Sequence, residues 1–492
     1  MLTVTRQESK LIISATRSIL RKLYSTKSRQ RLNSFLPNRL RRLFLFGALC
    51  SGTFFSTQAA EYSRPNVIFI LIDDMGFGDL SCTGNTDVET QHIDRLAREG
   101  SLFKQFYVAS PICSPSRAAF TTGQYPARHL INSFLAGRKR NRERGMRDFL
   151  DPAAPAIARA FRTGGYVTAH YGKWHMGGGR DVDDAPQPSA YGFDEHFVNA
   201  EGMGPRVDRK IDPKYTWTRT YVDKSIDFID RNKREPFYLQ LWLNDVHDRH
   251  VPSDAFLKRH ERHADRPFTH LFYAVLDEMD EQLGRLVDHV DSLGLGEKTL
   301  FVLTSDNGPT AWRHYYRKGP NVAPGSTAGF RGRKWSLYEG GIRMPLIVRW
   351  KGTIPAARVD DSSILAAVDF FPTLSRLAKV TPPRVEFDGI DASHVFLGQP
   401  LQRETPLFWE YGRDKSYLKP GGVVDRSPNC AIREGRWKLL INADGSGLEL
   451  YDFDQATDEA QNVAAQHPVT AKRLAKRLLD WRASLPSLDD AN

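Results

Sequence analysis

The sequence has few cysteines: four in 492 residues, at Cys50, Cys82, Cys113 and Cys430. Cys50 falls in an N-terminal segment that we expect to be removed, and three remaining cysteines cannot build a disulfide framework. The fold must therefore rely on a hydrophobic core, for which 492 residues with 40% hydrophobic content are ample. Cys82 and Cys430 could pair, but nothing in the sequence requires it. Internal repeats and low-complexity tracts are not evident.

The body of the chain also lacks an excess of charge. The net charge of +11 arises from 69 Lys and Arg against 58 Asp and Glu. Residues 1–60 hold eleven of the bases and one of the acids, which leaves 58 bases, 57 acids and a net charge of +1 for the rest. A nearly neutral body has no charge excess with which to hold a phosphate backbone, so we expect no nucleic-acid partner.

The apolar run at residues 43–55 is too short to span a membrane comfortably. A basic stretch precedes it, and the small residues Thr57, Ala59 and Ala60 follow, which is the order of a secretory signal. We predict cleavage after Ala59 or Ala60, no membrane span in the mature chain, and an exported protein that is periplasmic or secreted. A buried helix or a membrane anchor is the alternative. Residues 1–35 exceed what such a signal needs and are consistent with an over-extended start.

Buried strands alternate with helical segments after the signal. The continuous apolar, β-branched run at residues 66–72 fits a strand buried on both faces. The pattern predicts further strands at residues 236–242, 299–304 and 345–350, and helices at residues 90–99, 153–162 and 268–290. This alternation indicates an α/β sandwich. Four acids on the last helix are expected to form a solvated face without a chemical role: Asp277, Glu278, Asp280 and Glu281.

The pattern changes after about residue 397. Residues 430–441 predict two short strands around a Glu434-Gly435 turn, and residues 448–453 predict another strand. An amphipathic closing helix is expected at residues 469–485. The chain is therefore divided into a signal segment at residues 1–60, a large α/β domain at residues 61–397, and a small C-terminal α+β domain with an antiparallel sheet at residues 398–492.

Two polar pairs directly follow apolar strands. Asp73 and Asp74 follow the run FILI, and Asp306 and Asn307 follow the run FVLTS. Loops at strand ends are where α/β folds gather function. Three carboxylates and an amide oxygen suit Ca²⁺ or Mg²⁺ and disfavour zinc. Either pair alone is more often a polar turn, but the two together favour a metal site.

Residues 113–123, CSPSRAAFTTG, resemble the signature of the sulfatase family, Cys-x-Pro-Ser-Arg followed by Thr-Gly. Residues 172–177, GKWHMG, are similar to the family's Gly-Lys-Trp-His-x-Gly motif, and Lys334 precedes a Tyr-Glu-Gly-Gly-x-Arg segment as it does in the family. The resemblance runs from about residue 65 to residue 453. A buried structural cysteine in a Pro-Ser turn is the alternative for the first motif taken alone.

The resemblance implies an alkaline-phosphatase-like sandwich with a central mixed sheet, and a sulfatase catalytic domain at residues 61–397. In the family the signature cysteine, here Cys113, is oxidised to formylglycine (3-oxoalanine), whose hydrate attacks the sulfur of a sulfate ester. This implies a formylglycine-generating or anaerobic maturation enzyme as a partner. It also implies Ca²⁺ with a particular ligand set: Asp73, Asp74, Asp306, Asn307 and the modified Cys113.

The resemblance also assigns the residues that handle the sulfate group. Arg117, Lys173 and Lys334 would offset its charge, and His175 would assist the diol. The family pattern Pro-His-x-Pro is replaced here by VHDRHVP, so the leaving-group histidine is His247 or His250. Strand spacing favours His247, and contact with substrate is then the alternative role for His250. Arg331, Arg333 and Arg343 are expected to be structural or to line the substrate rim.

Export and long loops at residues 178–208 and 310–331 suggest a sulfated carbohydrate as substrate. Four tryptophans are candidates for stacking on sugar rings, although each is equally suited to the core: Trp174, Trp217, Trp312 and Trp335. The nearest alternative is a phosphodiester or phosphonate hydrolase of the same superfamily, against which Asn307 argues because those enzymes tend to carry His there. A non-catalytic glycan-binding protein with an unconverted Cys113 is the third possibility.

Overall fold

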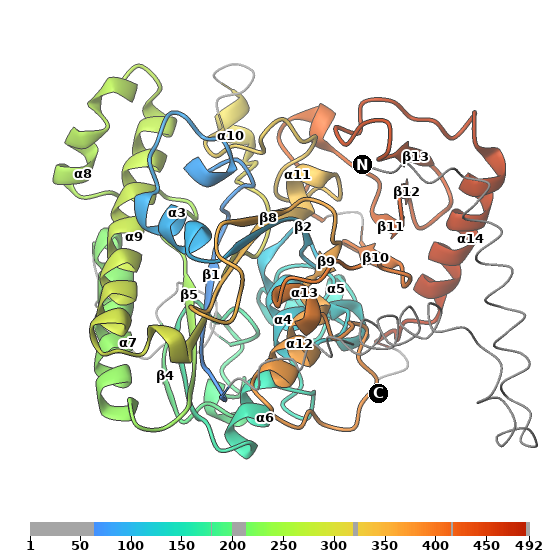
Figure 1. Ribbon diagram of the computed structural model, residues 1–492. Helices are drawn as coiled ribbons and strands as arrows, with labels where there is room; N and C mark the ends of the chain where they lie inside the picture. Colours follow the sequence, from blue (N-terminus) through green and yellow to red (C-terminus); the bar gives the residue numbers. More distant parts are fainter. Residues whose placement is uncertain (1–62, 179, 199–212, 318–322, 415–416, 489–492) are drawn as a thin grey trace, which may run out of the picture. The chain divides into compact units, whose positions relative to one another are not determined.

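Strand β1 (Asn66–Ile72) forms where its uninterrupted apolar run predicts it, and every one of its residues is buried. It lies inside a nine-stranded sheet (Figure 1). The computed structural model describes residues 63–178, 180–198, 213–317, 323–414 and 417–488. The expected signal segment at residues 1–60 lies outside the described residues.

The strand order of this sheet is β4-β3-β5-β1-β6-β7-β2-β8, with β9 paired to β2. Strand β7 runs antiparallel to both β6 and β2, and the other pairs are parallel, so the predicted central mixed sheet is confirmed. The other strands are β2 (Ser101–Tyr107), β3 (Val167–Gly172), β4 (Glu195–Phe197), β5 (Phe237–Leu243), β6 (Thr299–Ser305), β7 (Arg343–Arg349), β8 (Arg358–Asp360) and β9 (Leu365–Ala366).

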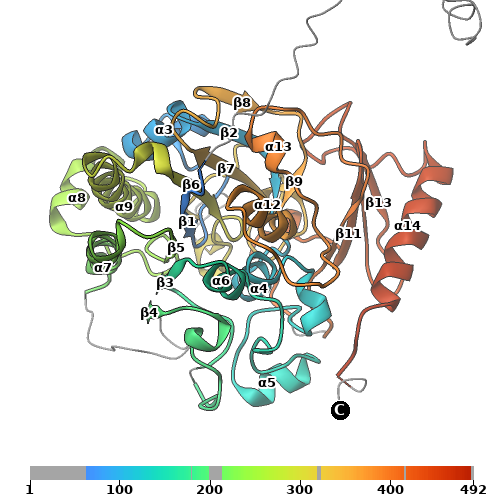
Figure 2. The ribbon, with the colours of Figure 1, turned by 60° about the horizontal axis from the view of Figure 1, so that its bottom comes forward.

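Helices cover both faces of the sheet (Figure 2). One layer contains α3 (Gln91–Arg98), α7 (Trp217–Asn232) and α9 (Pro267–Ser292), and the other contains α4 (Cys113–Thr122), α6 (Ile157–Thr163) and α12 (Phe370–Leu377). Side chains of β1 alternate between these layers: Ile68 and Ile70 pack into the first, whereas Phe69 contacts Phe120 and Phe370 of the second. Each such fully buried side chain contributes roughly 1.5–3 kcal/mol.

A second sheet lies in the C-terminal part of the chain. Its four antiparallel strands are β10 (Leu407–Glu410), β11 (Cys430–Glu434), β12 (Trp437–Ile441) and β13 (Glu449–Asp452), and α14 (Pro468–Ala483) packs against it. The turn between β11 and β12 falls where the sequence predicts it, and Gly435 has a φ of 57°, which glycine adopts without steric cost. The short helices are α5 (Arg138–Glu143), α8 (Asp254–Arg259), α10 (Arg313–Tyr316), α11 (Glu339–Ile342) and α13 (Ser393–Phe396).

A fully buried ion network joins β12 to α11. Lys438 Nζ lies 2.8 Å from Oε1 of Glu339 and 2.8 Å from Oε1 of Glu459, and all three side chains have no exposed surface. The hydroxyl of Tyr107 on β2 donates to Oε2 of Glu339 at 2.6 Å. The C-terminal sheet is therefore held to the central sheet by charged groups as well as by apolar packing.

The expectation of a solvated acidic face on α9 is wrong for two of its four acids. Asp280 is 2% exposed and accepts hydrogen bonds from the N–H groups of His92 at 3.0 Å and Ile93 at 2.8 Å. Glu278 is 8% exposed and accepts from the N–H of Ser253 at 3.0 Å. A carboxylate at a helix N-terminus satisfies otherwise unpaired N–H groups, so Asp280 ties the start of α3 to α9.

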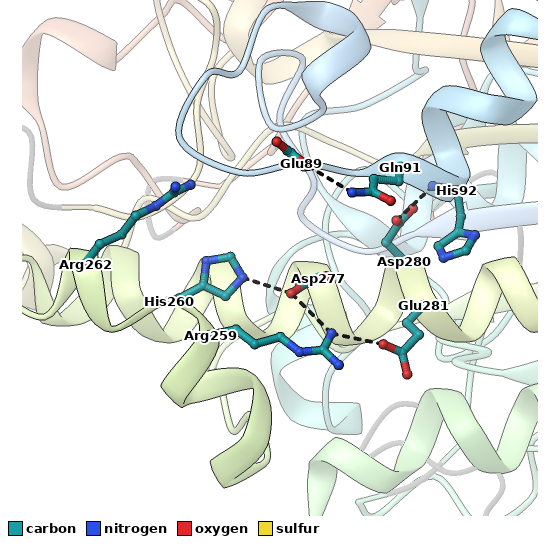
Figure 3. A pocket seen from close by; sticks show the side chains of 9 residues that line it. All are labelled: Glu89, Gln91, His92, Arg259, His260, Arg262, Asp277, Asp280 and Glu281. Atoms are coloured by element: carbon teal, nitrogen blue, oxygen red, sulfur yellow. Dashed lines mark hydrogen bonds and ion pairs between the residues drawn. The ribbon is translucent and has the colours of Figure 1, made fainter.

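The other two acids, Asp277 and Glu281, line a surface cavity of about 410 Å³ (Figure 3). Asp277 pairs with His260 at 3.0 Å, and Glu281 pairs with Arg259 at 3.0 Å. These two acids thus form ion pairs between α8 and α9.

The three cysteines in the described part of the chain, Cys82, Cys113 and Cys430, form no disulfide. Among the described residues, no helix combines the length and the apolarity needed to cross a membrane.

Candidate active site

Three neighbouring parallel strands end at the candidate site. Strand β1 lies between β5 and β6, and Ile72 is in register with Leu243 and Ser305. The next residues continue this pairing: the N–H of Asp73 donates to the Leu243 carbonyl at 3.0 Å, and the N–H of Asp306 donates to the Ile72 carbonyl at 3.2 Å. Asp73 and Asp306 therefore lie on adjacent strands at the carboxyl edge of the sheet, where α/β folds bind ligands.

The four predicted metal ligands Asp73, Asp74, Asp306 and Asn307 lie together and are fully buried. Asn307 Nδ2 donates to Asp74 Oδ1 at 2.8 Å, and the N–H of Asp74 donates to Asp306 Oδ1 at 3.3 Å. Within the described part of the chain, Asp73 Oδ1 and Asn307 Oδ1 have no hydrogen-bond partner. Buried polar atoms are nearly always satisfied, and oxygen atoms are the ligands of hard divalent cations. These side chains therefore fit such a cation.

Cys113 is the first residue of α4 and follows the extended residue Ile112. It is 3% exposed, and its sulfur forms a group with carboxylate oxygens of Asp73 and Asp306 whose atoms all lie within 4.8 Å of one another. No side chain caps this helix, which leaves its first N–H groups available to an anion. Burial raises the pKa of the Cys113 thiol, so the unmodified thiol stays protonated and is a poor nucleophile.

Arg117 joins three parts of the site and is fully buried. Its Nε and Nη2 donate to Oδ2 of Asp306 at 2.9 and 2.7 Å. Its Nη1 donates to the carbonyl of Lys173 at 2.9 Å, and its guanidinium lies 5.1 Å from the centre of the Trp242 ring. The planar guanidinium thus holds a ligand carboxylate and the main chain beyond β3 in one fixed geometry.

Two lysines each pair with one carboxylate. Lys173 Nζ donates to Asp73, and Lys334 Nζ donates to both oxygens of Asp74 at 2.6 and 2.7 Å. Burial alone would raise the pKa of Asp73, but Lys173 and the other nearby cations outweigh it and hold that pKa well below its usual value. Arg117 and the two lysines balance three carboxylates, so the cluster is close to neutral. Two further positive charges from a divalent ion would suit it to an anion.

The structure separates His247 from His250. Nε2 of His247 lies 3.8 Å from Oδ2 of Asp74, and its side chain is 16% exposed. His250 is 8% exposed, shares a hydrogen bond with the Val246 carbonyl at 2.9 Å, and packs edge-on against Phe272. Burial lowers the pKa of His247 to about 4, so its ring is neutral near pH 7. His247 borders the carboxylate cluster, and His250 packs inside the fold.

His175 lies in the glycine-rich turn after β3, with a φ of 55°. Its Nε2 is 3.3 Å from the Leu135 carbonyl, and its Nδ1 is buried without a hydrogen-bond partner among the described residues. The N–H of Leu135 donates to Oγ of Ser114, next to Cys113, at 3.0 Å. A neutral ring that donates through Nε2 presents Nδ1 as an acceptor. His175 is therefore held by the same loop that contacts the start of α4.

The three arginines of residues 331–343 are bonded to the protein itself. Arg331 Nη1 donates to the hydroxyl of Tyr451 at 3.0 Å. Arg333 Nε donates to the Thr310 carbonyl at 2.9 Å, and Arg343 Nε donates to the Lys104 carbonyl at 2.7 Å. These contacts fix the three side chains within the protein, and the expectation that they are structural or line the substrate rim stays a prediction.

The four candidate stacking tryptophans differ in exposure. Trp174 is fully buried, Trp335 is 3% exposed, and Trp217 packs partly buried against the core. Trp312 on the loop before α10 is 36% exposed. The expected rim loops at residues 178–208 and 310–331 lie partly outside the described residues. Of the four side chains, Trp312 has the most surface to offer to a ligand.

Lys214 is a site residue that the sequence pattern did not reveal. Its Nζ donates to the carbonyls of Asp245 at 3.1 Å, of Arg249 at 3.0 Å, and of His247. Burial lowers the pKa of Lys214 to about 8. A lysine near the start of a helix carries no signal for this role, because its three acceptors are main-chain atoms more than 30 residues away. Lys214 thus fixes the loop that carries His247.

We expect Lys214→Met to lower kcat/KM for the sulfate-ester hydrolysis that the family resemblance implies, roughly 10–100-fold, because small displacements of reacting groups have effects of that size. The loss should fall mainly on kcat, since the loop is released while Lys173 and Lys334 keep their carboxylate partners. Steady-state kinetics on an aryl sulfate measure both constants. Lys233→Met, at the exposed C-terminal end of α7, is the matched control. Unchanged kcat in Lys214→Met would contradict the positioning role.

Carboxylates, cations and the start of a helix thus meet at the carboxyl edge of a mixed sheet, in a site suited to a tetrahedral oxyanion. The fold is that of the alkaline-phosphatase-like hydrolases. Residues 65–380 match the model of the sulfatase family, and residues 329–484 match that of the N-sulphoglucosamine sulphohydrolase C-terminal region. The chain therefore belongs to the sulfatase family and is a sulfuric ester hydrolase.

Known proteins of this family are similar over most of the chain. An N-acetylgalactosamine-6-O-sulfatase of Bacteroides thetaiotaomicron is 28% identical, over 84% of this chain and 92% of the relative. A steryl-sulfatase of Mus musculus is 30% identical, over 70% of this chain and 67% of the relative. A solved sulfatase structure from work on glycosaminoglycan metabolism by Bacteroides thetaiotaomicron superposes with a TM-score of 0.69 and is 25% identical, covering 86% of this chain and all of that one.

Proposed function

We propose that the protein is an exported, calcium-dependent sulfatase that acts on a sulfated carbohydrate and uses formylglycine made from Cys113. The observation that carries the proposal is the grouping of the Cys113 sulfur with the Asp73 and Asp306 carboxylates at the start of α4. Asp73, Asp74, Asp306 and Asn307 would hold Ca²⁺, since two of their buried oxygens lack other partners among the described residues. The site residues are thus assigned the roles that the sequence predicts for them.

Formylglycine, once hydrated, supplies a geminal diol as the nucleophile toward sulfur, and Ca²⁺ supplies positive charge beside it. The chain's own groups do the rest. Lys173 and Lys334 bind sulfate oxygens and offset the charge that develops on them. Asp306, oriented by Arg117, accepts the nucleophile's proton. His247 or Lys334 stabilises the departing oxygen, and the free Nδ1 of His175 accepts a proton as sulfate is released.

The carbohydrate assignment rests on the extent of similarity. The match to the N-acetylgalactosamine-6-O-sulfatase spans nearly all of that relative, whereas the match to the steryl-sulfatase spans about two thirds of it. Asn307 in the ligand set favours sulfate over a phosphodiester, and parallel assays on an aryl sulfate and an aryl phosphodiester separate these two activities.

The first test is mass spectrometry of the tryptic peptide at residues 105–117, from protein made in a host that matures sulfatases. We expect the aldehyde in place of the Cys113 thiol, together with aryl-sulfate hydrolysis that chelation by EGTA abolishes and added Ca²⁺ restores. Cys113→Ala should fold normally, because it replaces a buried small side chain, and should lose hydrolysis. An unmodified thiol in protein from the native organism, or full activity in Cys113→Ala, would refute the mechanism. Retained glycan binding without hydrolysis by aldehyde-bearing protein would instead favour a non-catalytic glycan-binding protein.

A further inference from the structure

An aromatic and basic cavity of about 710 Å³ is lined by Trp335, the residue that follows Lys334. Its other walls come from residues 312–317, at and around α10, and from residues 417–419. Six residues give it its character: Trp312, Trp335, Tyr417, Arg313, Arg317 and Lys419. None of them has a role in the chemistry described above. We call this feature the aromatic–basic cavity.

Trp335 connects this cavity to the sulfate-binding residues. It directly follows Lys334, whose Nζ holds Asp74, and it adopts a left-handed backbone with a φ of 72°. Its N–H donates to the carbonyl of Pro111 at 2.8 Å, two residues before Cys113. A left-handed backbone costs a bulky residue free energy and persists only where surrounding contacts enforce it. The position of the indole is therefore set by its surroundings. The cavity wall is thus anchored to the segments that carry Lys334 and Cys113.

The indole of Trp335 has an unused hydrogen-bond donor. Trp335 is 3% exposed, and its Nε1 is buried without a partner in the described part of the chain. Its ring packs edge-on against Trp312, with centroids 4.7 Å apart and an interplanar angle of 85°. Buried indole N–H groups usually find a partner. The buried Trp335 ring thus supports Trp312 at the wall of the cavity.

Trp312 offers a flat apolar surface at the mouth of the cavity. Its 36% exposure is large for a tryptophan, a residue that is highly buried on average. Tyr417 supplies a second ring, and Lys419 Nζ lies 4.6 Å from the centre of that ring. Aromatic rings next to polar groups suit ligands that are apolar on one face and hydrogen-bonding at the edges. The pyranose ring of a sugar has this character.

The basic residues of the cavity have no carboxylate partner in the part of the chain that the structure describes. Arg313, Arg317 and Lys419 are exposed. No carboxylate among the described residues lies within 4.0 Å of their charged groups. Most arginines elsewhere in the fold are paired, as Arg128 is with Asp388 at 2.7 Å. Unpaired cations around a concave surface attract anions and raise their local concentration.

We propose that the aromatic–basic cavity binds a second, anionic sugar of the substrate, next to the sugar whose sulfate is removed. Trp312, supported edge-on by Trp335, stacks on the ring, and Arg313, Arg317 and Lys419 bind its sulfate or carboxylate. The substrate is then a glycan that carries negative charge on successive sugars, rather than a single sulfated sugar or a sterol. This inference rests on the proposed function and deepens it.

The test compares tetrasaccharides of chondroitin 6-sulfate and of heparin with the single sugars N-acetylgalactosamine 6-sulfate and glucosamine 6-sulfate, using Cys113→Ala protein so that binding is measured without turnover. We expect Trp312→Ala to weaken binding of at least one sulfated tetrasaccharide about tenfold by calorimetry, the effect of losing one aromatic contact. Binding of the single sulfated sugars, which cannot reach the cavity while their sulfate is in the active site, should change less than twofold. In matured enzyme, kcat/KM should fall by the same factor for that tetrasaccharide and stay unchanged for 4-methylumbelliferyl sulfate.

The charge contribution is tested by the pair Arg313→Ala and Arg317→Ala, which should weaken tetrasaccharide binding more at low salt than at high salt. Arg376→Ala is the matched control, because its side chain is 74% exposed and lies outside the cavity. Neutral cellotetraose should not bind. Tetrasaccharide affinity unchanged by Trp312→Ala, or an equal loss on the aryl sulfate, would overturn the proposal. Tetrasaccharide binding that depends on Trp312 without hydrolysis of any sulfate by matured protein would refute the proposed function and leave the cavity assignment standing.

Discussion

Replacing Arg117 with lysine is expected to lower kcat/KM for an aryl sulfate roughly 100–1,000-fold, the size of effect seen when one preorganised charged contact is removed from an active site. Arg117 makes two hydrogen bonds to Asp306 and a third to the Lys173 carbonyl. A lysine ammonium is a point charge and cannot make these three hydrogen bonds in the planar geometry of a guanidinium. Charge is conserved in the variant, so the loss reports the orientation of Asp306 and Lys173 rather than the net charge of the site.

Arg128→Lys is the control for this prediction. Arg128 also binds a carboxylate through Nε and Nη2, at 2.8 and 2.7 Å from Asp388, but its side chain is 38% exposed. The Arg128→Lys variant should keep kcat/KM within about twofold of the unsubstituted protein, because exposed ion pairs contribute little to stability. Calcium affinity, measured by calorimetry, should fall in Arg117→Lys alone, since Asp306 is a ligand in the proposed site. Equal kinetics in the two variants would show that Arg117 does not orient the site.

Replacing Lys438 with methionine is expected to destabilise the protein by about 3–5 kcal/mol, the range measured when one partner of a buried ion pair is removed. Methionine is close to lysine in length, so little cavity forms. Glu459, 2.8 Å from Lys438 Nζ, then loses its cation, and Glu339, also 2.8 Å from that atom, keeps only Arg343 at 3.4 Å among the described residues. The midpoint of urea unfolding measures the change. Adding Glu339→Gln and Glu459→Gln to the variant should recover most of the stability.

The same variant should respond strongly to pH. Burial raises the pKa of Glu459 from 4.5 to about 7, against the opposing charge of Lys438. A carboxyl whose pKa is higher in the folded state favours folding below the unfolded pKa, and this contribution is lost as the pH rises through the folded pKa. Without Lys438 the carboxyl pKa rises further, so the stability deficit should be small at pH 5 and large at pH 8. An equal deficit at both pH values would contradict the assignment of the network as ionised.

The regular elements near the site follow closely from the sequence. Uninterrupted apolar runs predict β1 and β6 to within one residue, because strands buried on both faces need no alternation. The polar pairs after these runs then fall at one edge of the sheet, because β1 and β6 are parallel neighbours. Strands β2 and β10 were not anticipated: SLFKQFY mixes polar and apolar residues, and β10 has only four residues.

Contacts made through the main chain could not be anticipated. Lys214 donates hydrogen bonds to three main-chain carbonyls, and Asp280 accepts them from two main-chain N–H groups. Every residue type carries these main-chain atoms, so no sequence pattern identifies the partners. The choice between His247 and His250 was open for a related reason. Both follow the same strand, and only the path of residues 246–250 decides which ring reaches Asp74.

The burial of Cys113 has a consequence for the order of events in the cell. The residue is 3% exposed, and the carboxylates of Asp73 and Asp306, which follow β1 and β6, lie beside it. Under the proposed function, an enzyme that oxidises this cysteine has to hold the segment around it in an open, extended form. Cys113 therefore has to be oxidised before folding is complete. A chain that packs α4 onto the sheet with an unmodified Cys113 is inactive for as long as it remains folded. Slower folding of this region would raise the yield of active protein, and overproduction beyond the capacity of the maturation enzyme would lower its specific activity.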